Sequence, residues 1–167
     1  MPDATKSMPL DGLKVLEMGT LIAGPFCGRL LAEFGAEVIK IEAPADGKID
    51  GGDPLRKWRK LHDADGQKTS LWWYAQARNK KSVTVNLREK EGQDIVRKLA
   101  LEADIVVENF RPGTLEKWNL GFESLIRDNP NRWVACATSR AIRIAHRCGW
   151  EFRSVIHWPR CTARWGR

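Results

Sequence analysis

A turn at residues 19–25, within the run GTLIAGPFCG, is the part of this chain best suited to bind a charged small molecule. It lies between an apolar run and a helical segment, and the start of a helix offers free backbone N–H groups and the positive end of its dipole to an anion. The turn therefore predicts a ligand that carries phosphate. It lacks the closely spaced G-x-G-x-x-G pattern of dinucleotide sites, which disfavours an ordinary NAD-dependent enzyme.

The elements around this turn must be a strand, a helix and a second strand. Residues 15–18 are apolar and short enough for a buried strand, Pro25 suits a first helical turn, and Gly35 is placed to end the helix. Residues 38–41 then form the second strand. The helix is predicted from apolar residues at three-to-four spacing, namely Phe26, Leu30, Leu31 and Phe34. Such a βαβ unit is typical of nucleotide-binding folds.

Strands and helices continue to alternate further along the chain. Residues 43–70 are rich in glycine and charged residues, and we expect them to form an exposed loop. Residues 82–87, SVTVNL, predict a β-branched strand, residues 89–103 a helix and residues 104–107 another strand. Short helices begin at Thr114.

This order of elements predicts a doubly wound α/β fold with a mainly parallel sheet, a Rossmann-like half-domain whose ligands bind at the carboxyl ends of the strands. By the same rule we expect three segments to converge on that edge. They are the turn at residues 19–25, the basic segment at residues 79–81 and a second turn at residues 109–113.

The composition is that of a globular protein, with 43% apolar and 29% charged residues in a chain of 167. No run of about eighteen apolar residues occurs, so no membrane-spanning segment is expected. The polar start, MPDATKSMPLDG, lacks the apolar core of a signal peptide. We therefore expect a cytoplasmic protein that makes no membrane contact.

The net charge of +7 lies entirely in the last part of the chain. Residues 1–130 carry 20 basic and 20 acidic side chains, whereas residues 131–167 carry eight arginines and one acid, Glu151. The same 37 residues hold four of the eight tryptophans and three of the four cysteines. Two compositions are therefore joined near residue 131, and the overall charge does not by itself indicate a nucleic-acid-binding protein.

Several blocks of sequence, in unbroken order, resemble the class III CoA-transferase family, which includes formyl-CoA and carnitine-type CoA-transferases and the α-methylacyl-CoA racemases. The blocks are AGPFC, LLAEFGAEVIKIEAP, GGDPLR, ARNKKSVTVNL, EADIVVENFRPGTLEKWNLGFESL and DNP. The resemblance covers roughly residues 10–130. It divides the chain into an N-terminal extension at residues 1–12, a CoA-transferase-like α/β domain at residues 13–130 and an unrelated tail at residues 131–167.

What this resemblance implies is transfer of CoA from an acyl-CoA to a carboxylic acid through a covalent aspartyl intermediate. The acyl-CoA thioester is a substrate, and neither a metal nor a bound cofactor takes part. Family members are homodimers, an assembly that we do not expect of this shorter chain.

The resemblance also assigns seven residues to the CoA site. Leu21 and Ala23 belong to the first turn, and the others are Asn79, Lys80, Asn109, Phe110 and Lys117. Lysines attract phosphate, Phe110 can flank adenine or the pantetheine arm, and asparagine can bond an amide or a ribose. One departure is visible, because Ala43 and Pro44 stand where some relatives place an arginine that stacks on adenine.

The tail departs from the family pattern. A relative continues after the DNP block with an apolar strand, a glycine-rich loop and the catalytic aspartate, and we expect none of these here, since residues 129–167 contain no Asp. We therefore assign no catalytic residue and expect a truncated, inactive N-terminal remnant. The amino acids from Arg140 to Cys161 allow codons that, when read in the frame starting at the third base, encode a glycine turn with an aspartate. This favours a tail produced by a shift of the reading frame, accompanied by a deletion in the gene.

Other interpretations of the tail and of the function stay open. Arginines interleaved with tryptophans can grip nucleic acid, although no known module is outlined. The Cys and His residues of the tail do not have paired zinc spacing, and a disulfide framework does not suit a cytoplasmic chain. For the function, the alternatives are a remnant of the racemase branch, which moves a proton beside the thioester, and a non-catalytic CoA-binding or interaction fragment.

Overall fold

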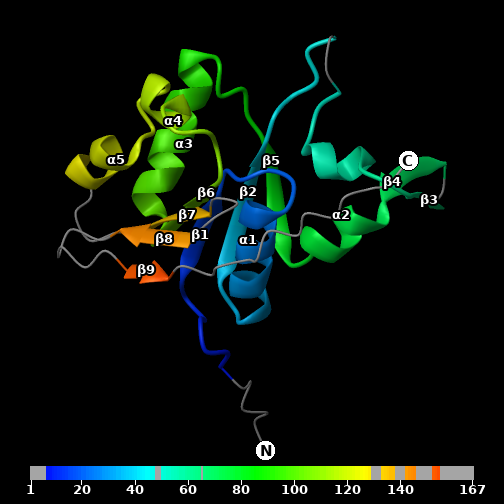
Figure 1. Ribbon diagram of the computed structural model, residues 1–167, viewed down its shortest axis with the longest axis horizontal. Coiled ribbons are helices and arrows are strands. Elements are labelled where there is room, and N and C mark those ends of the chain that lie inside the picture. Colours follow the sequence, from blue (N-terminus) through cyan, green and yellow to red (C-terminus); the bar gives the residue numbers. More distant parts are fainter. Residues whose placement is uncertain are drawn as a thin grey trace, which may run out of the picture.

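The computed structural model describes residues 7–47, 50–64, 66–128, 133–137, 142–145 and 152–154. Its strands and helices follow one another along the chain as a series of alternating elements (Figure 1). In chain order they are β1 (Lys14–Glu17), α1 (Ala23–Glu33), β2 (Glu37–Glu42), the 3₁₀ helix η1 (Pro54–Lys57), β3 (Leu61–Ala64), β4 (Gln67–Ser70), α2 (Leu71–Gln76), β5 (Lys80–Thr84), α3 (Lys90–Glu102), β6 (Ile105–Glu108), α4 (Thr114–Lys117), α5 (Phe122–Asp128), β7 (Trp133–Ala137), β8 (Ile142–Ala145) and β9 (Phe152–Ser154).

The main sheet has the strand order β5-β2-β1-β6-β7-β8-β9 among the described residues. The pairs from β5 to β7 are parallel, and β8 and β9 add antiparallel strands at one edge. Strand order runs outward in both directions from β1, because α1 leads to β2 on one side and later helices lead to β6 on the other. The predicted doubly wound, mainly parallel α/β fold is confirmed.

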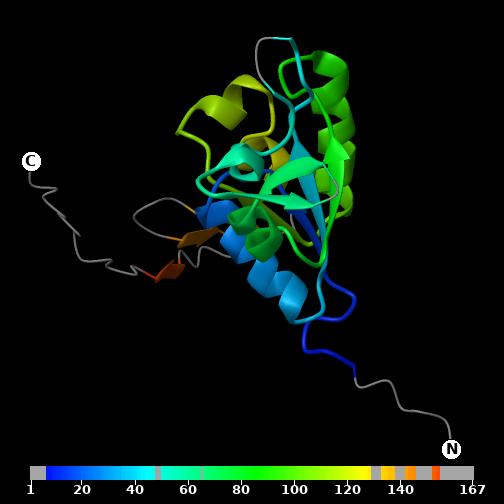
Figure 2. The same cartoon turned by 90° about the vertical axis from the view of Figure 1, so that its right-hand side faces the viewer.

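Helices cover the sheet on both faces, and the two faces have separate apolar cores. Figure 2 shows α1 and α3 on opposite sides of the strands. Alternate residues of β1 divide between the faces: Val15 packs in the core on the α1 side, whereas Leu16 packs with Val96 of α3. Each strand of the sheet centre is therefore buried on both sides, as parallel sheets require.

Helix α1 approaches the sheet through small residues rather than large ones. The predicted helix is present, but Phe26 and Phe34 are 42% and 53% exposed. Its buried residues are Gly24, Pro25, Gly28 and Ala32. The stripe of small side chains lets the helix backbone lie close over charged groups of the sheet. Leu31 packs against the core on this face, whereas Phe26 stays exposed.

The segment predicted as an exposed loop at residues 43–70 is more ordered than expected. It contains η1 and a two-stranded antiparallel hairpin of β3 and β4. Leu55 is fully buried and Asp53 is 3% exposed. The Asp53 side chain accepts a hydrogen bond from the Leu55 N–H and so caps η1. The expectation of an exposed loop was therefore wrong for this part of the segment.

The strand that we expected to be missing after the DNP block is present. Strand β7 runs parallel to β6, with Val106 opposite Val134 and Glu108 opposite Cys136. The side chains of the tail, on which the nucleic-acid, zinc and frameshift hypotheses depend, lie outside the described residues. In the part of the chain that the structure describes, no helix combines the length and apolar character that a bilayer crossing needs.

Candidate functional site

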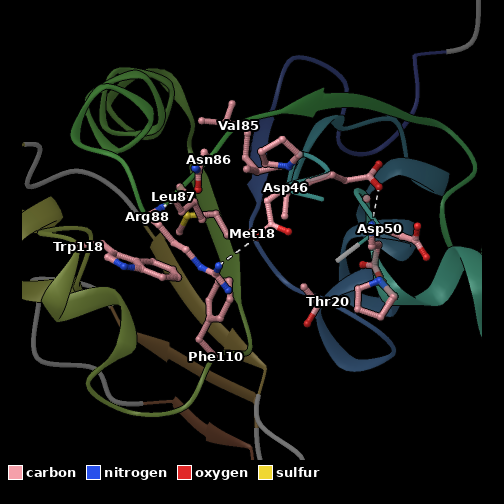
Figure 3. A pocket seen from close by; sticks show the side chains of 17 residues that line it. Met18, Thr20, Asp46, Asp50, Val85, Asn86, Leu87, Arg88, Phe110 and Trp118 are labelled. Atoms are coloured by element: carbon pink, nitrogen blue, oxygen red, sulfur yellow. Dashed lines mark hydrogen bonds and ion pairs between the residues drawn. The ribbon is translucent and has the colours of Figure 1, made fainter. Parts of the chain in front are cut away.

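A cavity of about 340 Å³ opens at the carboxyl ends of β1, β2, β5 and β6 (Figure 3). This is the edge at which doubly wound folds bind ligands. Four chain segments line it, one after each strand. They supply Met18 and Thr20; Ile41, Glu42, Ala43, Pro44, Asp46, Asp50, Gly52, Asp53 and Pro54; Val85, Asn86, Leu87 and Arg88; and Phe110 and Trp118.

One wall of the cavity is aromatic and apolar. The Phe110 and Trp118 rings meet edge to face, with centroids 5.6 Å apart and planes at 84°. Met18, which is 1% exposed, lies beneath them in the core. Aromatic faces of this kind accept a planar ring of a ligand.

Both positive and negative side chains lie at the cavity mouth. Among the described lining residues Arg88 is the one Lys or Arg, and its Nη1 lies 3.5 Å from Oδ2 of Asp46. Both side chains are well exposed at 70% and 36%, so the contact is weak and water can compete with it. A phosphate that reached the guanidinium would replace it with a stronger, charge-assisted hydrogen bond.

The first turn (residues 19–25) forms the next part of the site and is unusually tight. A Cβ on either Gly19 or Gly24 would lie 2.7 Å from the Cα of the other, so only glycine fits at both positions. Between them, Leu21 has a φ of 61°, a left-handed conformation that is costly for a branched side chain. Asn109 brackets Thr20, since its Oδ1 accepts from the Thr20 N–H at 2.8 Å and its Nδ2 donates to the Thr20 carbonyl at 2.9 Å.

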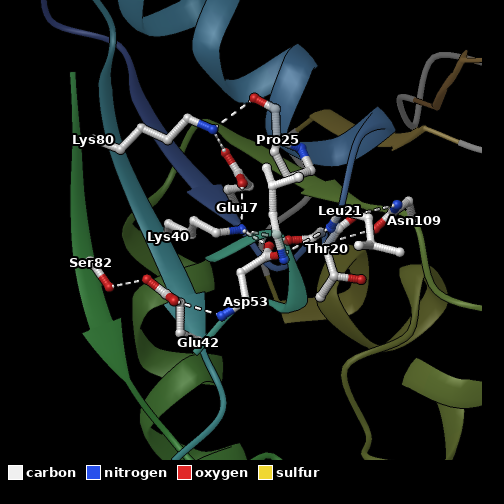
Figure 4. Close-up of polar contacts among 12 residues, drawn as sticks. Glu17, Thr20, Leu21, Pro25, Lys40, Glu42, Asp53, Lys80, Ser82 and Asn109 are labelled. Atoms are coloured by element: carbon white, nitrogen blue, oxygen red, sulfur yellow. Dashed lines mark hydrogen bonds and ion pairs between the residues drawn. The ribbon is translucent and has the colours of Figure 1, made fainter. Parts of the chain in front are cut away.

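A buried cluster of charges lies directly behind this turn (Figure 4). The Lys40 ammonium is 1% exposed and lies 2.9 Å from Glu17 Oε1 and 2.8 Å from Asp53 Oδ2. It also donates to the Gly19 carbonyl at 2.8 Å. Burial alone would lower the pKa of Lys40, but the attraction of Glu17 and Asp53 outweighs it, so the pKa is raised and the ammonium stays charged.

Lys80 enters the same cluster from β5. Its ammonium is 1% exposed, lies 2.6 Å from Glu17 Oε2 and donates to the Pro25 carbonyl at 2.7 Å. Burial lowers the pKa of Lys80, and the ion pair with Glu17 offsets this only in part. The two oxygens of Glu17 are thus divided between two lysines, with helix α1 lying over them at Gly28.

A second carboxylate, Glu42, anchors the loop that borders the cavity. It accepts from the Arg56 guanidinium at 2.7 and 2.8 Å, from the Ser82 hydroxyl and from the Asp53 N–H at 2.7 Å. Burial would raise the pKa of Glu42, but these hydrogen bonds outweigh it and hold the pKa at about 2. Arg56 in turn lies over the Trp73 ring at 3.7 Å.

The seven residues assigned by resemblance lie in four places: the cavity wall, the first turn, the end of α4 and the start of β5. Phe110 lines the cavity, and Leu21 and Asn109 shape the first turn beside it. Ala23 begins α1, and Lys117 is exposed at the end of α4. Asn79 and Lys80 belong to the segment that does not converge on this edge.

That lack of convergence corrects one expectation from the sequence. Strand β5 begins at Lys80, which pairs with Val38 near the start of β2, so residues 79–81 lie at the amino edge of the sheet. Asn79 is exposed there with a φ of 61°. Lys80 nevertheless contributes to the site region, because its side chain carries the ammonium to Glu17 and Pro25. Its charge is buried and paired, and it is not a surface group open to phosphate.

Sequence reasoning missed the residues that build most of the site. Arg88 and Trp118 carry no signal beyond their position after a strand or helix. Glu17 and Lys40 do carry one, since each is a charged residue inside an otherwise apolar strand (VLEM and VIKI), where an unpaired charge would be too costly.

The fold is that of a doubly wound α/β protein, a class in which ligands bind at the carboxyl edge of the parallel sheet. Among such proteins the sequence is specific: the profile of CoA-transferase family III matches residues 10–139, and the chain belongs to that family.

Relatives with established names support the same membership. The chain is 57% identical over 122 residues to succinyl-CoA–D-citramalate CoA-transferase of Chloroflexus aurantiacus, a match that covers 73% of this chain and 28% of the relative. It is 45% identical over 130 residues to the beta subunit of succinyl-CoA–L-malate CoA-transferase of the same organism, covering 78% and 30%. The chain thus spans less than a third of the length of these two relatives.

Solved structures agree with the fold. A CAIB/BAIF family protein from Brucella suis is 41% identical with a TM-score of 0.70, covering 77% of this chain and 33% of that one. Rv3272 from Mycobacterium tuberculosis, in its orthorhombic form, is 38% identical with a TM-score of 0.69, covering 81% and 36%.

Proposed function

We propose that this chain carries the CoA-binding portion of a CoA-transferase, and that the cavity at the carboxyl edge of the sheet holds the adenosine and phosphate end of CoA. The observation that carries the proposal is the composition of the cavity: an aromatic pair on one wall, one arginine at the mouth and a tight glycine turn beside them. An adenine ring fits the aromatic wall, and a phosphate fits the guanidinium.

Individual residues take separate parts in this proposal. Phe110 and Trp118 flank the adenine, and Arg88 exchanges its contact with Asp46 for a phosphate of the ligand. Leu21, Ala23 and Asn109 shape the adjoining wall, Lys117 adds an exposed positive charge beyond α4, and Lys80 acts from behind the turn.

For the whole protein we propose transfer of CoA from an acyl-CoA to a carboxylic acid. An enzyme carboxylate attacks the thioester carbonyl and expels the CoA thiolate, leaving a mixed anhydride; the thiolate then attacks the enzyme acyl carbon and expels the donor acid. The acceptor acid resolves the resulting enzyme thioester by the same two steps in reverse. Residues 129–167 contain no Asp, so we propose that this chain binds CoA without transferring it.

The test is calorimetric titration of the chain with CoA, with succinyl-CoA as the first acyl form because two relatives carry it in their names. Arg88→Ala should weaken binding about tenfold, the effect of losing one hydrogen bond between charged groups. The matched control is Lys98→Ala, which removes the same charge from an exposed position on α3 and should leave the affinity unchanged.

A second variant tests the aromatic wall. Phe110→Ala should weaken CoA binding by about tenfold or more, because stacking of a base on an aromatic ring has that value. If Arg88→Ala and Lys98→Ala lost the same amount of CoA affinity, only the overall charge of the protein would matter. If Phe110→Ala bound CoA with unchanged affinity, the adenine would have to lie elsewhere. Turnover of succinyl-CoA with added carboxylic acids would contradict the claim of binding without transfer.

A further inference from the structure

Side chains from three distant elements hold the backbone of the first turn from behind. Lys40 of β2 donates to the Gly19 carbonyl at 2.8 Å, and Lys80 of β5 donates to the Pro25 carbonyl at 2.7 Å. Asp53, just before η1, accepts from the Leu21 N–H at 3.1 Å through Oδ1. The turn is therefore fixed at both ends and in its middle by buried charges (Figure 4).

Lys40 and Asp53 form the centre of this support. Their ion pair is 2.8 Å long, and each side chain is 1% exposed. While one carboxylate oxygen of Asp53 faces Lys40, the other holds the N–H groups of both Leu21 and Leu55. One carboxylate thus joins the first turn to the loop before η1, two neighbouring segments that both line the cavity.

The arrangement balances an unfavourable backbone conformation. Leu21 has a φ of 61°, a region that leucine enters only when its surroundings impose it. The hydrogen bond from its N–H to Asp53 is one of the contacts that hold this conformation. Lys40 holds the Asp53 side chain in place through their ion pair, in which both groups are shielded from solvent.

We propose that Lys40 and Asp53 are positioning residues, which hold the first turn and the loop before η1 at the spacing that CoA binding needs. This inference rests on the proposed function, because it assumes that CoA occupies the cavity. Asp53 is among the residues that line the cavity, but both side chains are 1% exposed, and the role proposed for them is to hold the backbone. Their effect is on the fraction of molecules in which the turn has its binding conformation, and affinity falls in proportion to that fraction.

The experiment compares Asp53→Ala with Asp53→Asn in the full chain. Alanine removes the acceptor for the Leu21 N–H, whereas asparagine keeps an acceptor oxygen at the same position and should rescue. Two quantities are measured: the hydrogen-exchange rate of the Leu21 amide and the dissociation constant for CoA. The matched control is Val96→Ala, a fully buried position in α3 that destabilises the core without contact to the turn.

Asp53→Ala should weaken CoA binding about tenfold, since a tenfold smaller fraction of ordered turn has that effect on affinity. With so small an ordered fraction, the Leu21 amide should lose most of its protection from exchange. Asp53→Asn should stay within about threefold of the unmodified chain in both quantities. Val96→Ala should leave both quantities unchanged once they are corrected for the fraction of molecules that is folded. Protection of the Leu16 and Ile39 amides shows that the sheet is still folded in each variant.

Two results would overturn the inference: unchanged Leu21 exchange in Asp53→Ala, or loss of affinity as large in Val96→Ala as in Asp53→Ala. A folded Asp53→Ala protein that exchanges faster at Leu21 but binds CoA normally would also overturn it. If the unmodified chain does not bind CoA, the proposed function fails, while the exchange rate of Leu21 still decides whether the Asp53 side chain fixes the turn.

Discussion

Replacing Gly28 with alanine tests the close approach of α1 to the buried charges. In an exposed helix this change would stabilise the protein by about 1 kcal/mol, because alanine is the better helix former. Here the added Cβ would lie 2.0 Å from Oε2 of Glu17 and 3.4 Å from Nζ of Lys80. We therefore expect the opposite sign.

The size of the effect follows from what Glu17 would have to give up. Its side chain is fully buried, and its two oxygens are held by Lys40 at 2.9 Å and Lys80 at 2.6 Å. Moving the helix outward instead is an overpacking cost of about 1–3 kcal/mol, whereas breaking a buried ion pair costs about 3–5 kcal/mol. We expect α1 to move outward for the most part, because this costs less than breaking the ion pairs of Glu17. After subtraction of the gain in helix propensity, the free energy of unfolding should fall by about 2 kcal/mol.

The assay is urea unfolding followed by circular dichroism, with the midpoint and slope compared between variants. Gly12→Ala is the control for adding a methyl group to a glycine in open space, because no atom lies within 4 Å of its Cβ position. Its positive φ of 89° should cost about 1 kcal/mol. A Gly28→Ala protein as stable as the unmodified chain, or more stable, would refute the claim that α1 is packed against a fixed carboxylate.

Three further predictions concern other parts of the chain. The pKa of Glu42 lies at about 2, below its ordinary 4.5, so its contribution to stability is complete above pH 4.5 and is lost as the pH falls toward 2. Glu42→Gln should therefore flatten the plot of unfolding free energy against pH over this interval. An unchanged plot would contradict the low pKa of Glu42. Arg97 joins α3 to α5 through the Asn119 carbonyl at 2.6 Å and the Ser124 hydroxyl at 2.9 Å, so Arg97→Ala should lower thermal stability by about 1–2 kcal/mol without changing CoA affinity, as scanning calorimetry and titration can show. We also propose that the tail is frameshifted: sequencing of the coding DNA should reveal, in the third-base frame of residues 140–161, a glycine turn with an aspartate, and a continuous gene without such a hidden segment would sink the proposal.

The architecture followed from the sequence because hydrophobic periodicity and turn residues act locally. The strand, helix and strand around the first turn were predicted at nearly their observed positions, with Gly35 in the left-handed conformation that a stop after α1 requires. Predictions were poorer where long-range packing determines which face of an element is buried. The buried stripe of α1 is made of small residues because charged groups lie beneath it, and nothing within the helix itself indicates this.

The site was predictable only in part for the same reason. The rule for doubly wound folds predicted that Asn109 and Phe110 lie at the carboxyl edge of the sheet, and the structure has them there, directly after β6. The same approach could not show that the Lys80 ammonium is buried against Glu17, because this depends on how β5 pairs with β2. Nor could it show that Asp53 connects two loops, because one partner lies 32 positions away along the chain.

The most direct test of the CoA assignment is a titration of the isotope-labelled chain with CoA, followed residue by residue through amide resonances. The account predicts saturable shifts for the segments that line the cavity, represented by Thr20, Arg88 and Phe110, and none for Ala100 or Leu125 in the core beneath α3 and α5. Absence of shifts at millimolar CoA, or shifts confined to residues away from the cavity, would contradict it.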